Sequence, residues 1–211
     1  MTVLTDAQRT RIATAVKSAE ARTSAEFVCA ATRAADTYFT APLLAAAVIA
    51  FGLPFAVAAL EPGWTGWNTH DPGITALQLL VYVIGAYGFT RPAIAVRLTP
   101  RAVKARRSAR LARAAVLELG LAGVKHRNGV LLFVALTERH VEVIADSGVH
   151  AKVDSGAWTS VVDAFTAGIR SGDVADGFVA ALDRLAPLLA AAYPRAADDV
   201  NEIPDHLVEL G

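Results

Sequence analysis

Two uncharged apolar runs constrain this chain more than any other feature. Residues 37–60 hold no charged side chain over 24 positions, and residues 72–90 form a second such run of 19. A membrane span needs about 20 apolar residues, and both runs are apolar on all sides of a helix rather than along one stripe. We therefore predict a transmembrane hairpin over 37–98, with spans at about 41–60 and 74–96. Two buried helices of a soluble core are the alternative.

The connection between the spans predicts how the hairpin is oriented. Its external loop, 61–73, contains Trp64 and Trp67, which suit a membrane–water boundary, and contains no Lys or Arg. Residues 91–117 hold eight basic side chains and no acidic one. The positive-inside rule then places both termini in the cytoplasm, in a multi-pass protein of the cell (inner) membrane of bacterial type. Residues 1–36 lack the apolar segment of a signal peptide.

Charge is polarised along the chain although the 20 basic and 20 acidic residues cancel. The basic segment 91–117 carries +8, and residues 118–211, with 7 basic and 14 acidic residues, carry −7. We predict a basic juxtamembrane helix over 99–121 that fixes topology and begins the next soluble helix. Its alternative role is to bind anionic headgroups. No aromatic residues interleave with the basic ones, which argues against a nucleic-acid partner. The predicted membrane-surface residues are Arg97, Arg101, Lys104, Arg106, Arg107, Arg110 and Arg113.

The polar segments on either side of the hairpin predict one α/β domain. A capping box at Thr5–Gln8 begins a helix that ends near residue 22, and a strand follows at 24–31. Residues 129–136 are a continuous apolar run typical of a strand buried on both faces, and 140–145 alternate as in a second strand. Helices are expected at 157–170 and 174–193. The domain therefore combines 1–36 with 122–193, and the acidic tail 194–211 is expected to be extended.

These elements resemble the TPM-domain family. The resemblance rests on the leading helix and strand, on Asn128-Gly129-Val130-Leu131 with the strands that follow, and on Gly172-Asp173 between two helices. It implies an α/β/α sandwich with a central mixed sheet, here carrying an inserted two-helix transmembrane hairpin. Family members resemble accessory proteins of membrane complexes, including photosystem-repair factors. Some bind calcium, and an acid phosphatase activity is attributed to a plant member. The usual domain is exported and precedes a single span, whereas this one is expected to be cytoplasmic.

The loop after the second strand of this pair contains the candidate metal ligands. Carboxylates that converge at strand ends suit hard cations, so Asp146 and Asp154 are predicted to bind Ca²⁺ or Mg²⁺, with help from Glu142 or Asp163. The alternative is that Asp154 or Ser155 caps the following helix and Asp146 closes a turn. The family's tyrosine-containing turn is replaced here by residues 146–149. No nucleophile elbow or phosphate-binding loop is present.

Three functions follow from these observations. The first is a non-enzymatic accessory module that binds an unidentified membrane or cytoplasmic protein from its anchor in the lipid bilayer. The second is a divalent-metal-dependent phosphatase that uses Asp146 and Asp154. The third is a lipid-surface protein that acts through residues 97–113. Small residues in the spans, such as Gly85, Gly88 and 45–47, leave open whether they pack within the hairpin or between chains of a homo-oligomer.

Overall fold

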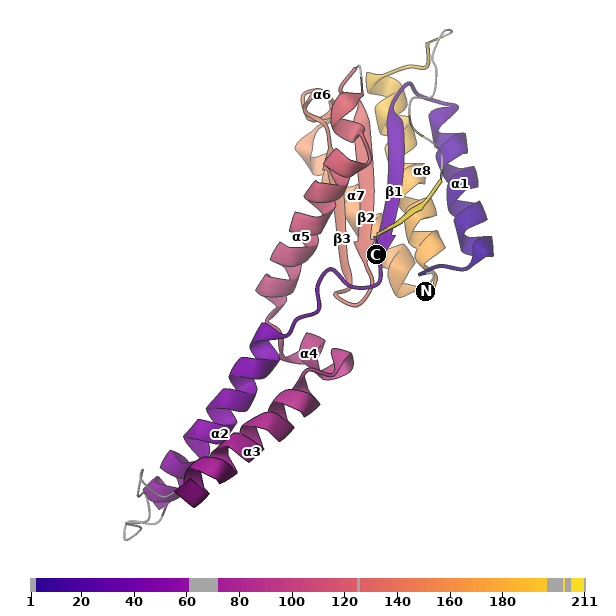
Figure 1. The fold of residues 1–211 in the computed structure, drawn as a ribbon. Helices are drawn as coiled ribbons and strands as arrows, with labels where there is room; N and C mark the ends of the chain where they lie inside the picture. The colour runs from indigo at the N-terminus through magenta and orange to yellow at the C-terminus, as the bar shows by residue number, and fades with distance from the viewer. Residues whose placement is uncertain (1–2, 61–71, 125, 197–202, 204–205, 211) are drawn as a thin grey trace. The chain divides into compact units, whose positions relative to one another are not determined.

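The computed structural model describes residues 3–60, 72–124, 126–196, 203 and 206–210 (Figure 1). The chain divides into two compact units. The first combines residues 1–35 with 105–211, and the second comprises residues 36–104. The second unit thus lies, in the sequence, between the two parts of the first.

A four-stranded mixed sheet lies at the centre of the first unit. Its strands are β1 (Glu26–Thr32), β2 (Gly129–Ala135), β3 (His140–Ala145) and β4 (Val208–Leu210), in the order β3-β2-β1-β4. β1 runs parallel to β2 and to β4, and β2 pairs antiparallel with β3. The strand that precedes the hairpin thus joins the two that follow it, as the sequence predicted, with Cys29 opposite Leu132.

Helices cover both faces of this sheet (Figure 1). On one face lie α1 (Asp6–Glu20), α7 (Ser155–Arg170) and α8 (Val174–Ala192), and on the other lies α5 (Arg101–Glu118). The shorter elements are η1 (Leu121–Gly123) and α6 (Ser147–His150). The described residues therefore form a mixed α/β fold with a four-stranded mixed sheet and eight α-helices.

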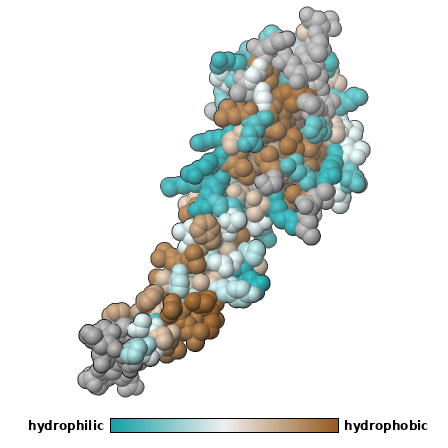
Figure 2. Space-filling view, viewed as in Figure 1, coloured by the Kyte–Doolittle hydropathy of each residue, from teal (hydrophilic) through white to brown (hydrophobic). Residues whose placement is uncertain are grey.

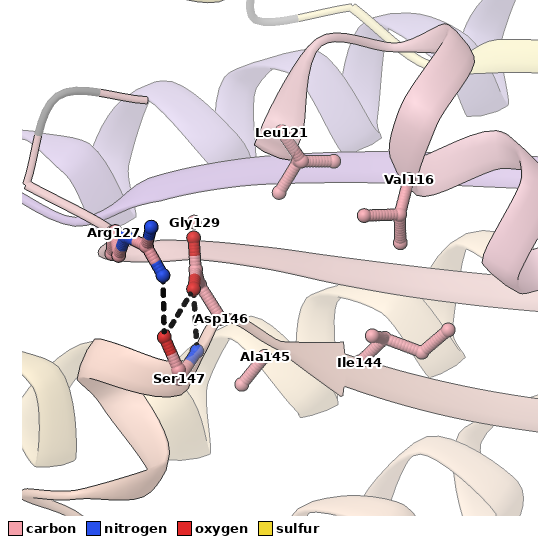
Figure 3. A pocket seen from close by; sticks show the side chains of 8 residues that line it. All are labelled: Val116, Leu121, Arg127, Gly129, Ile144, Ala145, Asp146 and Ser147. Atoms are coloured by element: carbon pink, nitrogen blue, oxygen red, sulfur yellow. Dashed lines mark hydrogen bonds between the residues drawn. The ribbon is translucent and has the colours of Figure 1, made fainter. Parts of the chain in front are cut away.

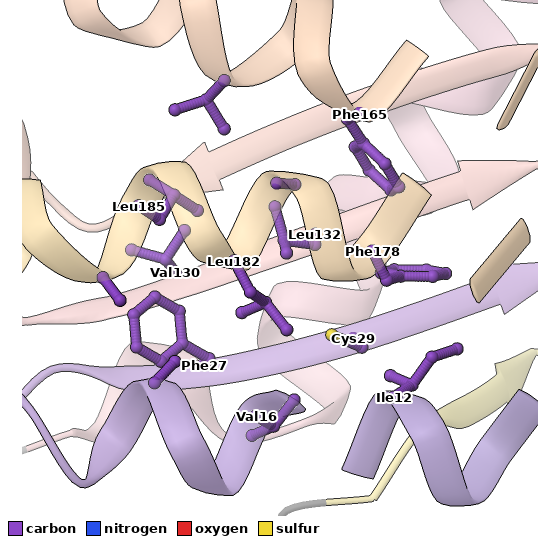
Figure 4. Packing of buried hydrophobic residues seen from close by; sticks show 14 of the residues in the cluster. Ile12, Val16, Phe27, Cys29, Val130, Leu132, Phe165, Phe178, Leu182 and Leu185 are labelled. Carbon is purple, nitrogen blue, oxygen red and sulfur yellow. The ribbon is translucent and has the colours of Figure 1, made fainter. Parts of the chain in front are cut away.

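The alternation of side chains along β1 and β2 produces two hydrophobic clusters. Every residue of both strands is buried, as expected of a sheet covered on both faces. The cluster against α1, α7 and α8 contains Phe27, Cys29, Leu132 and the tilted ring pair Phe165–Phe178, whose centroids lie 4.9 Å apart (Figure 4). The cluster on the other face packs side chains of β1 and β2 against Ala112 and Ala115 of α5, together with Leu121.

The capping box predicted the start of α1 correctly, and a similar side-chain cap begins α8. The Thr5 hydroxyl accepts from the Gln8 amide at 3.3 Å, and the Gln8 side chain accepts from the Thr5 amide at 2.9 Å, which completes the capping box. Asp173 caps α8 by accepting from the Ala175 amide at 2.9 Å. Pro187 lies inside α8 without dividing it.

The sequence did not predict strand β4; the acidic tail 194–211 was expected only to be extended. Residues 208–210 instead pair with residues 30–32 of β1. A three-residue strand is too short to show alternation, so its periodicity could not be detected. Glu209 fixes this strand by accepting from the amides of Val3 and Leu4 at 2.8 and 3.1 Å.

The second unit is a helical hairpin of α2 (Thr40–Leu60) and α3 (Pro72–Phe89), followed by α4 (Pro92–Leu98). α2 and α3 lie side by side (Figure 1). Gly85 faces Ala46 so closely that an added Cβ would lie 3.3 Å from the Ala46 Cβ. This glycine therefore packs within the hairpin, whereas a Cβ at Gly88 would meet nothing within 4 Å.

The second predicted span, 74–96, differs from the helices observed. The chain turns by 98° between Thr75–Phe89 and Pro92–Leu98, because Pro92 begins a new helix after Arg91. Across the described residues, no single helix combines the length and the hydropathy needed to cross a membrane, whereas this bent pair does so in combination. The predicted loop 61–73, with both of its tryptophans, lies outside the described residues apart from its last two positions.

Candidate functional site

A pocket of about 400 Å³ lies at one end of the β2–β3 hairpin (Figure 3). The antiparallel pairing places the start of β2 beside the end of β3, and the Asp146 amide donates to the Gly129 carbonyl at 2.9 Å. Residues from four neighbouring segments therefore surround one cavity. Its lining consists of Val116, Leu121, Arg127, Gly129, Ile144, Ala145, Asp146 and Ser147.

The polar side of the pocket is a chain of three side chains. Arg127 Nη1 donates to Ser147 Oγ at 3.5 Å, and Ser147 Oγ donates to Asp146 Oδ1 at 2.9 Å (Figure 3). The same carboxylate oxygen accepts from the Ser147 amide at 2.5 Å. The Asp146 carboxylate is thus engaged at the beginning of α6, where it caps the helix.

Backbone geometry holds the two polar segments of the pocket together. Arg127 has φ of +48°, in the left-handed region. This conformation is energetically unfavourable for residues other than glycine, and residues that adopt it are frequent near functional sites. Opposite Arg127, a Cβ at Gly148 would lie 2.5 Å from the Arg127 carbonyl oxygen. Only glycine lets the α6 turn approach the Arg127 backbone this closely. Asn128 adds a further constraint because its buried side-chain amide donates to the Ser24 carbonyl.

The opposite side of the pocket is apolar. Val116 from α5, Leu121 from η1 and Ile144 from β3 line it (Figure 3). A Cβ at Gly129 would lie 2.6 Å from Leu121 Cδ2, so the η1 turn packs directly on the start of β2. The arrangement suits a group that presents an apolar surface to α5 and a polar end to Arg127 and Ser147.

The two predicted metal ligands both act as helix caps in this structure. Asp154 accepts from the Gly156 amide at 2.8 Å and begins α7, and Asp146 begins α6. Glu142, one of the two proposed helpers, lies 3.2 Å from His140 Nε2. Among the described residues, no three His, Cys, Asp or Glu side chains are grouped so that they could hold a metal ion. Asp154 therefore has its alternative role as a helix cap, Asp146 caps α6 where the alternative was that it closes a turn, and the Ca²⁺ or Mg²⁺ site stays a prediction.

A second group of side chains lies next to α6. The Lys152 Nζ lies 3.8 Å from the centre of the Tyr193 ring, and the rings of His150 and Trp158 lie 5.4 Å apart. Burial raises the pKa of the Tyr193 hydroxyl, and the nearby Asp146 charge raises it further. Sequence reasoning missed Tyr193, as it missed Arg127. Only the position of Arg127 just before the Asn-Gly turn distinguished it from other surface arginines.

The structure divides the seven predicted membrane-surface residues into groups. Arg97 and Arg101 are exposed, and Lys104 donates to the Val96 carbonyl at 3.2 Å. On α5, Arg106, Arg110 and Arg113 are exposed, and Arg107 is partly buried. On the inner side of α5, Ser108, Ala112 and Ala115 form a narrow buried stripe. Their small side chains carry little hydrophobic signal, so the stripe does not stand out in the sequence.

Comparison with known proteins relates this fold to a described domain. Residues 89–188 match the TPM domain. The TPM match runs from the end of α3 to α8 and includes all the pocket residues, whereas α1 and β1 lie outside it. A comparison with curated proteins finds no significant match.

A solved structure shares the fold. It is the NMR structure of the BA42 protein from the psychrophilic bacterium Bizionia argentinensis, with a TM-score of 0.62 and 16% sequence identity. The similarity covers 99% of this chain and 97% of that one. The TPM-domain resemblance drawn from the sequence is thus supported for residues 89–188, and the α/β fold is supported by structural similarity.

Proposed function

We propose that this chain is an integral membrane protein whose apolar hairpin anchors a TPM-like α/β domain. The domain acts as a non-enzymatic accessory module that binds a protein of a membrane complex. The observation that carries the proposal is the apolar surface of α2 and α3 (Figure 2). Eleven of the large apolar side chains described on these two helices are 47–69% exposed, namely Leu44, Val48, Ile49, Phe51, Phe55, Leu77, Leu79, Leu80, Val83, Ile84 and Tyr87.

Exposure on this scale is unfavourable in water. Burying one such side chain contributes about 1.5–3 kcal/mol, and monomeric soluble proteins rarely expose so large an apolar patch. α2 and α3 contain 21 and 18 residues, which correspond to about 32 and 27 Å at 1.5 Å per residue. Among the described residues neither helix alone has the length and hydropathy of a span, so the proposal relies on α3 and α4 together, beside α2, to cross the hydrocarbon core. The close approach of Gly85 to Ala46 is typical of helices that pack in lipid through small residues.

Charge supports the orientation that the proposal assigns. Basic residues follow the hairpin at once, from Arg91 to Arg113, with no acidic residue among them. The proposal therefore keeps both termini in the cytoplasm of a bacterial-type cell. A reporter that is active only in the cytoplasm, fused after Gly211, should be active. Activity of a periplasmic reporter at the same position would contradict this orientation.

The accessory role is supported by how the two candidate metal-binding carboxylates are used, of which Asp146 lines the pocket. Asp146 and Asp154 accept backbone amides at helix starts, which is a structural task. The pocket combines an apolar wall with Arg127 and Ser147, as expected of a surface that receives a side chain of a partner.

A paired experiment separates this role from the phosphatase alternative. The purified chain should release no phosphate from a generic ester with Ca²⁺ or Mg²⁺ present, and Asp146→Asn should behave identically. Crosslinking in membranes should recover a specific protein, and an Arg127→Ala/Ser147→Ala variant should lose it. Metal-dependent phosphate release that Asp146→Asn abolishes would contradict the accessory role.

A further inference from the structure

Three arginines of α5 share one exposed face. Arg106, Arg110 and Arg113 follow the i, i+4, i+7 spacing of a helix, so they fall within an arc of about 60°. Leu117, which is 72% exposed, extends the same face by one turn. We call these four residues the arginine face. Ser108, Ala112 and Ala115 lie on the opposite side of the helix and are buried.

The sheet determines which side of α5 is free. Ala112 and Ala115 pack against the cluster of β1 and β2 side chains, so the arginines point away from the core. Within the described part of the chain, no carboxylate forms a salt bridge with Arg106, Arg110 or Arg113. A helix that needed these charges only for solubility would gain from carboxylates at i+4. Here the segment 91–117 contains none.

We infer that the arginine face binds the phosphate groups of anionic lipids. This inference rests on the proposed membrane anchor, because Arg106 follows the last residue of α4 by only eight positions. Guanidinium groups bind phosphate oxygens in a bidentate manner, which distinguishes them from lysine ammonium groups. Leu117 on the same face adds an exposed apolar side chain that can contact the headgroup region. Charge complementarity thus favours an anionic lipid surface as the occupant.

The test uses the full chain reconstituted into phosphatidylcholine vesicles with or without phosphatidylglycerol. A fluorophore on Leu117→Cys reports contact through a quencher attached to lipid headgroups. Cys29 is fully buried and should take no label. Quenching should be strong only with phosphatidylglycerol and should weaken at high salt, because salt screens exposed charges.

Variants identify the side chains responsible. In Arg106→Gln/Arg110→Gln/Arg113→Gln, the docking equilibrium should fall about 100-fold, since each basic residue near an anionic surface contributes about a factor of five. The corresponding triple lysine variant should retain part of the quenching, which excludes misfolding. The matched control replaces three exposed basic residues elsewhere with glutamine, and it should behave as wild type. These residues are Lys17, Arg170 and Arg184.

Equal quenching in both kinds of vesicle, or in the arginine and control variants alike, would overturn the inference. Preferential binding of polyglutamate over phosphatidylglycerol vesicles would also overturn it and assign the face to an acidic protein. Carbonate extraction of the same vesicles tests separately whether the hairpin is inserted in the bilayer. If carbonate releases the chain but headgroup quenching still requires the three arginines, the proposed anchor is refuted and the arginine face is not. A chain that resists extraction but is indifferent to phosphatidylglycerol refutes the arginine face alone.

Discussion

Arg9 Nη2 donates to Glu209 Oε1 at 2.8 Å and thereby links α1 to β4. The same carboxylate accepts from two backbone amides near the start of α1, so one side chain satisfies three donor residues. Charged hydrogen bonds contribute about 1.5–3 kcal/mol each when protected, and less when exposed. Glu209 is about one-fifth exposed, so its contacts should contribute measurably to the stability of the sheet edge.

Glu209→Gln should therefore lower the free energy of unfolding by about 2 kcal/mol. Urea denaturation of the full chain in detergent measures this change, and hydrogen exchange of residues 208–210 should accelerate. Glu118→Gln, an exposed carboxylate at the end of α5, is the matched control and should change neither value. Equal behaviour of the two variants would show that β4 does not depend on this contact.

Two carboxylates predict how the free energy of unfolding decreases at low pH. The Ala175 amide, the Gln8 side chain and Arg11 hold the pKa of Asp173 below its ordinary value. The Val3 amide and Arg9 do the same for the pKa of Glu209. The unfolded state then binds more protons than the folded state, so this stabilisation is complete above the ordinary carboxyl pKa of about 4. It is lost as the pH falls through the lowered values.

Urea midpoints should accordingly stay level from neutral pH to about pH 5 and fall below about pH 4. Asp173→Asn should be less stable at neutral pH and should show a shallower acid limb, because the remaining amide carries no titrating charge. If Asp173→Asn follows the wild-type profile throughout, Asp173 does not contribute through ionisation.

Gly85 predicts a specific packing defect in the hairpin. Gly85→Leu should force α2 and α3 apart, because even a Cβ would lie 3.3 Å from Ala46. Overpacking of this kind costs about 1–3 kcal/mol. Gly88→Leu, three residues further along α3, has open space and should be tolerated. Thermal unfolding in detergent compares the two, and equal loss in both would refute the close α2–α3 contact.

Cys29 provides a chemical test of the core. Burial raises the pKa of its thiol strongly, and Glu20 raises it further. The reactive thiolate should therefore be scarce at pH 8, and iodoacetamide should modify the native chain far more slowly than the denatured chain. Mass spectrometry measures both rates. Rapid modification of the native chain would mean that β1 is not covered by α1 and α8.

The elements of the α/β domain were predictable because their signals are strong and local. Residues 129–135 are continuously apolar, and the capping box at Thr5 uses only neighbouring residues. The position of β1 in the sheet followed from the need to bury an isolated strand. β4 was not predictable, since its three residues pair with β1 from almost 180 positions away.

The pocket was predictable only in part. Asp146 was singled out because it follows a strand, and it does line the pocket. Asp146 acts as a cap because its carboxylate accepts from the Ser147 amide. The spacing of residues in the sequence does not show whether such a carboxylate binds a backbone amide or a metal ion. The Arg127–Ser147 contact joins residues 20 positions apart across the β2–β3 hairpin, so it required the register of that hairpin.

Alkaline carbonate extraction of membranes from cells that express the full chain tests the central claim most directly. Carbonate removes peripheral proteins and leaves integral ones in the membrane pellet. The account predicts that the chain stays in the pellet after carbonate and is released only by detergent. Release of the chain into the carbonate supernatant would contradict the proposal that α2 and α3 anchor it in the bilayer.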